Sequence, residues 1–267
     1  MQRWRPSFFL KLSMVLHGAA LLSFIVAPAQ WRIGLIAIVC NHLLITAIGL
    51  WPRSNWLGSN WTRLPPAAAA RNEIAITIDD GPDPDVTPQV LDILEQHGTV
   101  ATFFCIGERA QRYPELCRDI ARRGHALENH SQLHRHNFSL RGYTVLRREI
   151  DTAQRTLENI CGERPQFFRA PAGLRNPFLD PVLKHCGLQL AAWTRRGFDT
   201  RQRDAQKVLK SLTHELAAGD ILLLHDGHAA RDENNRAVIV TVLPELLQAI
   251  RAAGLIAVTL RAAKVTH

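Results

Sequence analysis

The chain has 267 residues, with 32 Lys and Arg against 24 Asp and Glu, which gives a formal net charge of +8. Seven of the basic residues and no acid lie in residues 1–72, which leaves a net charge of only +1 for the rest of the chain. Charge confined to one end argues against a nucleic-acid partner for the folded part. The five cysteines form no Cys-x-x-Cys pair. This excludes the common zinc-knuckle and redox motifs and agrees with free thiols in a reducing compartment.

The first 52 residues are predicted to anchor the chain in a membrane. Two apolar runs, Leu12–Ala27 and Ile33–Trp51, are near the roughly 17–25 residues that a helix needs to cross the hydrocarbon layer. The link between them is short, which favours a helical hairpin. Tryptophans lie at or near the ends of the runs, as interfacial anchors do, at Trp4, Trp31, Trp51, Trp56 and Trp61.

A cleaved signal peptide is the alternative for the first run, because Ala27-Pro28-Ala29 resembles a cleavage site. The proline inside this triplet and the second apolar run that follows both argue against cleavage.

Basic residues predict the orientation of the hairpin. Only Arg32 lies in the link, whereas the flanking residues are Arg3, Arg5 and Lys11 before the hairpin and Arg53, Arg63 and Arg71 after it. The positive-inside rule then places both ends, and the catalytic domain, on the cytoplasmic face of the cell (inner) membrane.

Residues 53–72 are rich in small residues and proline, without an apolar period, and are predicted as a linker. From residue 73 to residue 262, short apolar runs alternate with amphipathic ones, which predicts one α/β domain with parallel strands. The predicted strands are Ile74–Ile78, Ala101–Ile106, Phe167–Arg169, Leu188–Trp193, Ile221–Leu224 and Ala257–Leu260. The predicted helices are Thr87–Gln96, Pro114–Arg123, Thr144–Cys161, Pro177–Cys186, Ala205–Ala218 and Val238–Ala253.

Chemically notable residues fall at or just after the ends of predicted strands, at Asp79, Asp80, Arg169, Asp199 and His225. This layout is typical of a barrel with its active site at the carboxyl ends of the strands. Two carboxylates at a strand end can take different roles, because successive side chains point to opposite faces.

Four ordered motifs resemble those of the polysaccharide deacetylase (NodB-homology) family. They are Thr77-Ile78-Asp79-Asp80-Gly81-Pro82, His130-Ser131-Gln132-Leu133-His134, Arg169-Ala170-Pro171-Ala172-Gly173 and Leu222-Leu223-Leu224-His225. The resemblance implies a distorted (β/α) barrel, a divalent metal ion, usually Zn²⁺, and hydrolysis of an N-acetyl group from an amino sugar.

We expect Asp80, His130 and His134 to bind the metal. The two histidines, at i and i+4, face one side of a helix or turn. One carboxylate and two imidazoles leave metal positions open for water and substrate, as in catalytic sites. A metal ion in such a site activates water and polarises the amide carbonyl.

The remaining roles follow from the same chemistry. Asp79 is expected to be the general base and His225 the general acid that protonates the departing amine. Arg169 is expected beside Asp79, where a cation favours and orients the carboxylate. Five residues are expected in the substrate-binding region. Pro171 and Gly173 are expected to shape a loop, and Trp193 and Leu223 to line the pocket for the acetyl methyl group, although either could belong to the core. Asp199 is the fifth.

The stretch from Trp193 to Thr200 departs from the family pattern. Arg196 stands where an acid is usual, so that Asp199 or Asp226 is left to tune His225. Arg195 and Arg196 are expected either to meet a phosphate on the substrate or to be solvated surface residues. His228 is expected to have a structural or surface role.

The leading functional hypothesis is a membrane-anchored amide hydrolase acting on a polyprenyl-phosphate-linked amino sugar for envelope glycan or lipid A modification. The alternative is deacetylation of a polymeric glycan, such as peptidoglycan or exopolysaccharide, outside the membrane, which requires the opposite topology. A non-catalytic glycan-binding barrel is a third reading, which loss of a ligand or of the base would favour.

Overall fold

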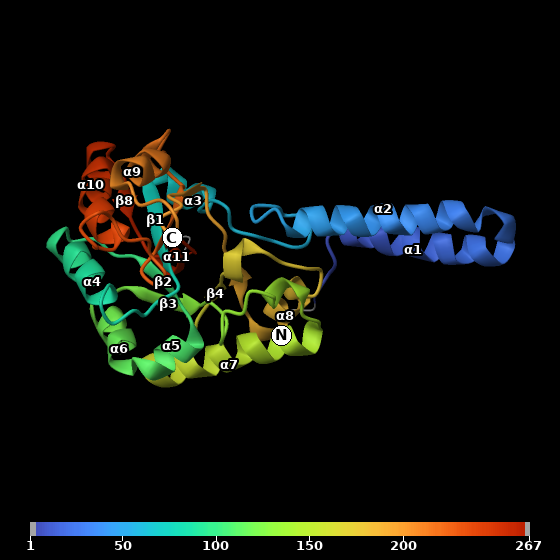
Figure 1. The fold of residues 1–267 in the computed structure, drawn as a ribbon, viewed down its shortest axis with the longest axis horizontal. Helices are drawn as coiled ribbons and strands as arrows, with labels where there is room; N and C mark the ends of the chain where they lie inside the picture. Colours follow the sequence, from blue (N-terminus) through green and yellow to red (C-terminus); the bar gives the residue numbers. More distant parts are fainter. Residues whose placement is uncertain (1–3, 265–267) are drawn as a thin grey trace.

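The computed structural model of the protein describes residues 4–264. At its centre is a sheet with the strand order β5-β4-β3-β2-β1-β7-β6, in which every pairing is parallel (Figure 1). The strands are β1 (Glu73–Asp79), β2 (Thr102–Cys105), β3 (Ala126–Asn129), β4 (Phe167–Phe168), β5 (Gln189–Leu190), β6 (Arg195–Arg196), β7 (Ile221–His225) and β8 (Ile256–Ala257), the last paired to the start of β1. The predicted α/β class is confirmed.

The sheet closes through one stretch of chain. β5 pairs with β4 and β6 pairs with β7, and only residues 191–194 separate β5 from β6. Trp61 bridges the irregular section, because its N–H donates to the carbonyl oxygen of Leu190 and its own carbonyl oxygen accepts from the N–H of Ala192. The result is the distorted barrel that the sequence predicts.

Helices cover the outside of the barrel (Figure 1). The longer ones are α4 (Thr87–Gln96), α5 (Gly107–Arg112), α6 (Pro114–Arg122), α7 (Tyr143–Cys161), α8 (Leu179–Cys186), α9 (Ala205–Thr213) and α10 (Val238–Ala252). Short helices are α3 (Pro66–Ala70), α11 (Leu260–Lys264) and the 3₁₀ turns η1 (Pro28–Gln30), η2 (Phe138–Leu140) and η3 (Pro171–Gly173).

The alternation of β1 connects the core to the site. Ile74, Ile76 and Ile78 are fully buried in the cluster that contains residues of α4 and α10. The intervening residues point to the opposite face, into the barrel, where Ala75 packs among residues of β2, β4 and β7. Thr77 and Asp79 share that face, so the carboxylate of Asp79 lies inside the barrel at the carboxyl end of β1.

Two apolar helices, α1 (Phe8–Val26) and α2 (Trp31–Gly49), extend from one side of the barrel as a hairpin (Figure 1). By length and composition, α1 and the segment Pro28–Gly49 that contains α2 are able to cross a membrane, with mean hydropathies of 1.9 and 1.8, and few of their residues are buried in the protein. The Nδ2 of Asn41 donates to the Oγ of Ser13 at 2.7 Å, which pairs polar groups inside the hairpin. At its base, Trp4 donates to Asp180 from Nε1 at 2.7 Å.

The segment predicted as a linker, residues 53–72, is folded against the barrel. Leu57, Leu64 and Ala68 are buried, and Leu64 donates its N–H to the carbonyl oxygen of Gly219. An ordered connection of this kind holds the base of the hairpin in a defined position relative to the barrel.

Some elements differ from the predictions. β3 was not predicted, because half of its residues are polar; Glu128 is nevertheless fully buried and accepts from Arg261 at 2.6 Å. α5 and β6 were also not predicted. The end of the predicted strand Ala257–Leu260 is wrong, because Leu260 begins α11. The Oγ1 of Thr259, just before this helix, accepts a hydrogen bond from the N–H of Ala262.

Candidate active site

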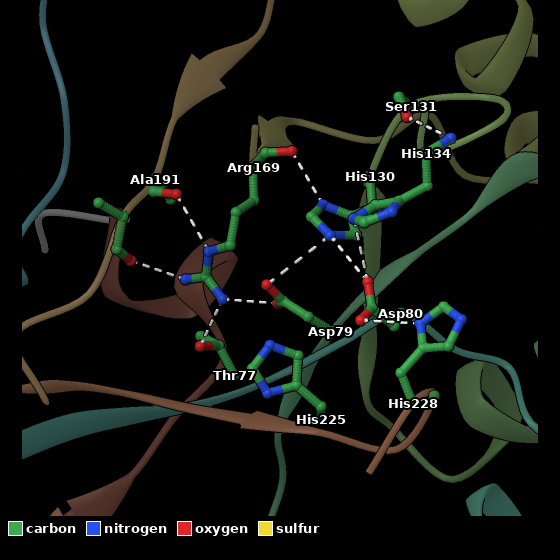
Figure 2. Close-up of polar contacts among 12 residues, drawn as sticks. Thr77, Asp79, Asp80, His130, Ser131, His134, Arg169, Ala191, His225 and His228 are labelled. Atoms are coloured by element: carbon green, nitrogen blue, oxygen red, sulfur yellow. Dashed lines mark hydrogen bonds and ion pairs between the residues drawn. The ribbon is translucent and has the colours of Figure 1, made fainter. Parts of the chain in front are cut away.

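The reactive side chains meet at the carboxyl ends of the strands, as predicted. Asp79, the last residue of β1, lies opposite His225, the last residue of β7. The loop after β3 carries His130 and His134, and Arg169 directly follows β4. Parallel strands place these ends at one edge of the sheet, so residues far apart in the sequence converge (Figure 2).

Asp80, His130 and His134 fit a divalent metal ion. The Oδ1 of Asp80 lies 3.2 Å from the Nε2 of His130 and 3.2 Å from the Nε2 of His134. This oxygen is buried and has no hydrogen-bond donor within residues 4–264. An unpaired buried acceptor is costly, whereas a cation between one carboxylate and two imidazoles would remove that cost. Three protein ligands are also the number typical of a catalytic metal site.

The surroundings prepare these residues for metal binding. The Nδ1–H of His130 donates to the carbonyl oxygen of Arg169 at 2.9 Å, which leaves Nε2 facing Asp80 (Figure 2). Burial, helped by the nearby His130, lowers the pKa of His134 to about 4, so its imidazole is neutral at neutral pH. Burial would raise the pKa of Asp80, but the neighbouring imidazoles of His130, His228 and His134 outweigh burial and hold that pKa well below its usual range.

Left-handed backbone conformations gather around the cluster. The φ angles are 75° at Asp80, 66° at Ser131, 47° at His134, 53° at Ala172 and 59° at His228. Such angles cost a non-glycine residue about 1–3 kcal/mol and occur at sites where the surrounding structure fixes them. The two metal-binding candidates His130 and His134 therefore converge from a tight loop. The sequence allowed either a helix or a turn here, and the structure has a turn.

Arg169 is the best-bonded side chain of the site. It is fully buried, and its Nη1 donates to the Oδ1 of Asp79 and to the Oγ1 of Thr77, both at 2.7 Å. Its other nitrogens donate to the carbonyl oxygens of Ala191 at 3.1 Å and Ala192 at 2.7 Å. The predicted contact between Arg169 and Asp79 is present. It occupies Oδ1 of the carboxylate and leaves Oδ2 on the side of His130 (Figure 2).

His225 is held by Asp199. The Nδ1–H of His225 donates to the Oδ1 of Asp199 at 2.9 Å, and its backbone N–H donates to Oδ2 at 2.7 Å. Burial lowers the pKa of His225, but the charges of Asp199, Asp79 and Asp80 outweigh burial and raise it overall. Of the two acids considered from the sequence, Asp199 contacts the histidine, whereas Asp226 is bonded to Thr87 at 2.5 Å and to the N–H of Gly227.

A cavity of about 240 Å³ lies over these groups. Its wall contains the three metal-binding candidates, Asp79 and His225, and three of the predicted substrate residues, Gly173, Trp193 and Leu223. Pro171 and Asp199 do not line it: Pro171 begins the turn that carries Gly173, and Asp199 contacts His225.

Sequence reasoning missed His228. Its Nδ1 lies 3.2 Å from the Oδ2 of Asp80, and the residue lines the cavity (Figure 2). His228 follows His225 by three residues, but the sequence predicted only a structural or surface role for it. The fold is what brings its ring to Asp80.

The barrel and the Asp80–His130–His134 cluster fit a hydrolase that uses a divalent ion. A family model for polysaccharide deacetylases matches residues 67–191. A peptidoglycan-N-acetylglucosamine deacetylase of Bacillus cereus is 37% identical over 65% of this chain and 81% of the relative. A chitooligosaccharide deacetylase of Azorhizobium caulinodans is also 37% identical, over 59% of this chain and 75% of the relative.

A solved structure of a family 4 carbohydrate esterase from Streptomyces lividans, in complex with acetate, has a TM-score of 0.63 and 28% identity. The match covers 69% of this chain and 91% of that one. The chain therefore belongs to the polysaccharide deacetylase family and is a hydrolase of carbohydrate amide C–N bonds. The predicted family is confirmed.

Proposed function

We propose that the protein is a membrane-anchored, metal-dependent deacetylase that removes N-acetyl groups from the amino sugars of a polymeric glycan. The observation that carries this proposal is one cavity that joins the Asp80–His130–His134 cluster to an acid and a histidine on paired strands. Loss of a metal ligand or of the general base would favour a non-catalytic barrel, but this chain retains the three candidate ligands and Asp79.

A divalent ion at this cluster, with zinc as our proposal, would supply an activated water and polarise the amide carbonyl. Asp79 accepts the proton of the attacking water through Oδ2, because Arg169 occupies its Oδ1. The Oδ2 atom lies 3.9 Å from the Nε2 of His130, which places the base beside the metal ligands.

His225 supplies the proton that the departing amine needs, because an amine anion is a poor leaving group. Its Nδ1–H is directed to Asp199, so the proton for transfer is on Nε2. Trp193 and Leu223, which are nearly buried where they line the cavity, offer an apolar contact for the acetyl methyl group.

The relatives favour a glycan over the polyprenyl-linked sugar of the leading sequence hypothesis. Their names refer to peptidoglycan and chitooligosaccharide, which fits the polymeric alternative. That substrate requires a catalytic domain outside the membrane, opposite to the orientation that the basic residues predict.

A lipid-linked amino sugar is the second candidate, because the rim of the cavity contacts the base of the hairpin. A Cβ at Gly173, which has a φ of 74°, would lie 2.6 Å from the ring of Pro52. Pro52 is the third residue after Gly49, where α2 ends, a span of at most about 11 Å. The site would therefore lie within reach of a sugar held at the membrane surface.

Mass spectrometry of products tests the proposal. The detergent-purified full-length protein is incubated with zinc or with a chelator, and with two substrates: an N-acetylglucosamine oligosaccharide and a polyprenyl-phosphate-linked N-acetylhexosamine. We expect zinc-dependent loss of acetyl mass from the oligosaccharide. Loss only from the lipid-linked sugar would support the second candidate, and no loss from either with metal bound would refute both.

Reporter fusions after Arg71 decide the orientation. A strong alkaline phosphatase signal places the barrel outside the membrane, as the polymeric substrate requires. A strong signal from fluorescent protein alone places it in the cytoplasm and favours the lipid-linked substrate.

A further inference from the structure

Arg196 belongs to the active-site cavity but has no part in the proposed mechanism. It is the second residue of β6, pairs in register with Leu223 of β7, and lines the cavity together with Asp79 and His225. The resemblance to the family motif implies an acid at this position, where this chain has Arg196. The chain therefore has a cation in the wall of the site that also contains Asp80, His130 and His134.

The cation is unpaired. Within residues 4–264 no carboxylate forms an ion pair with Arg196, and its buried Nε atom has no hydrogen-bond partner. The neighbouring Arg195 differs: its Nε donates to the Oδ2 of Asp220 at 2.6 Å, and its guanidinium also donates to the carbonyl oxygen of Glu215. Because successive strand residues face opposite sides, Arg195 is tied to structure while Arg196 faces the cavity.

Two aromatic rings hold the guanidinium. Its central carbon lies 5.4 Å from the ring centroid of Trp193 and 5.1 Å from that of Phe198. Phe198 adopts a φ of 58°, a conformation that non-glycine residues rarely take, and its side chain is 56% exposed. Rings that contact the faces of a guanidinium leave the N–H donors at its edge available to a ligand.

The other charges of the cavity are already engaged. Asp79 is bonded to Arg169 at 2.7 Å, and Asp80 is in contact with His130, His134 and His228. An anion that enters the cavity would therefore find Arg196 as a cation with open donors. The planar fork of arginine matches the two oxygens of a carboxylate or a phosphate.

We propose that Arg196 binds an anionic group, a carboxylate or a phosphate, that the substrate carries close to the N-acetyl group to be removed. This inference rests on the proposed function and adds the chemical class of the substrate. Hydrogen bonds in which one partner is charged are stronger than those between neutral groups. In a partly open cavity we expect an anionic ligand to bind about tenfold more tightly than its neutral analogue, equivalent to about 1.4 kcal/mol.

Three ligands of equal length test this specificity. The neutral one is the N-acetylglucosamine tetrasaccharide. The carboxylate one alternates N-acetylglucosamine with N-acetylmuramic acid, and the phosphate one is the neutral tetrasaccharide with a 1-phosphate. Their Kd values are measured by calorimetry on the full-length, zinc-loaded Asp79→Asn protein, in which we expect turnover to be strongly slowed, and turnover is measured separately on the protein that retains Asp79.

The variants are Arg196→Gln, which removes the charge, and Arg196→Lys, which keeps it without the fork. Arg203→Gln is the matched control, because Arg203 is exposed and does not line the cavity. We expect the preference for one anionic ligand to fall to about one in Arg196→Gln, to survive in part in Arg196→Lys, and to remain in Arg203→Gln. Metal content and far-UV circular dichroism confirm that each variant is folded.

The preferred ligand identifies the anion as carboxylate or phosphate. The inference is overturned if neither anionic ligand binds more tightly than the neutral one, or if the preference persists in Arg196→Gln. Tight, Arg196-dependent binding without deacetylation of any of the three ligands would refute the proposed function and leave the anion site in place.

Discussion

Arg169 offers the sharpest test of how the base is positioned, through the variant Arg169→Met, which keeps much of the side-chain length and removes the charge. Asp79 is only 3% exposed and would be left without its cation. Breaking a buried ion pair by removing one partner costs about 3–5 kcal/mol, and the carbonyl oxygens of Ala191 and Ala192 would lose their donors as well. Domains of this kind are stable by only about 5–15 kcal/mol, so we expect the loss to be large relative to the total.

Urea denaturation in detergent, followed by tryptophan fluorescence, measures the loss. Chelator is present throughout, because metal binding would otherwise stabilise each folded variant by a different amount. Arg169→Lys keeps the charge but loses the fork, and we expect it to lose about 1.5–3 kcal/mol, the worth of a hydrogen bond to a charged group. Turnover should fall in both variants, since Asp79 loses its fixed orientation.

A double-mutant cycle decides whether the buried charge is the cause. In the double variant Asp79→Asn and Arg169→Met, no unpaired carboxylate remains, so we expect part of the stability lost in Arg169→Met to return. A loss below about 1 kcal/mol in Arg169→Met, which is the size of an exposed ion pair, would refute this reasoning. The absence of any recovery in the double variant would do the same.

Three further variants test the roles in the site. Asp79→Asn should retain metal by elemental analysis and lose at least about a hundredfold in turnover, as removal of a general base does; normal turnover would contradict the role of Asp79. His134→Ala should purify with little bound metal, and unchanged metal content would contradict its assignment as a ligand. Asp199→Asn should move the alkaline limb of the pH–rate profile to lower pH: Asp199 raises the pKa of His225, and activity that needs its protonated form is lost as pH rises through that pKa. An unmoved limb would show that Asp199 does not tune the acid.

The identity of the chemistry could be predicted from the sequence because it depends on residue types at local spacings. Asp79 and Asp80 follow an apolar strand directly, and His130 and His134 lie within one loop. The alternation of strands and helices predicted a parallel barrel, in which strand ends must meet at one edge. The apolar hairpin was equally visible as two runs long enough to become helices α1 and α2.

Contacts between distant segments were decided by the tertiary structure alone. Glu128 and Asn129 form a buried strand because Arg261, Ile150 and Gln154 supply partners that no local pattern shows. The sequence left Asp199 and Asp226 as equal candidates beside His225, and only the packing of β7 decided between them.

The position of each arginine in β6 was likewise decided by the fold. Arg195 and Arg196 are adjacent and chemically identical, so composition assigns them the same role. They lie on opposite faces of one strand, so that Arg195 pairs with the carboxylate of Asp220 and Arg196 lines the cavity. A sequence states which groups a chain has, but the partners that each buried group finds depend on how strands far apart in the chain come to lie side by side.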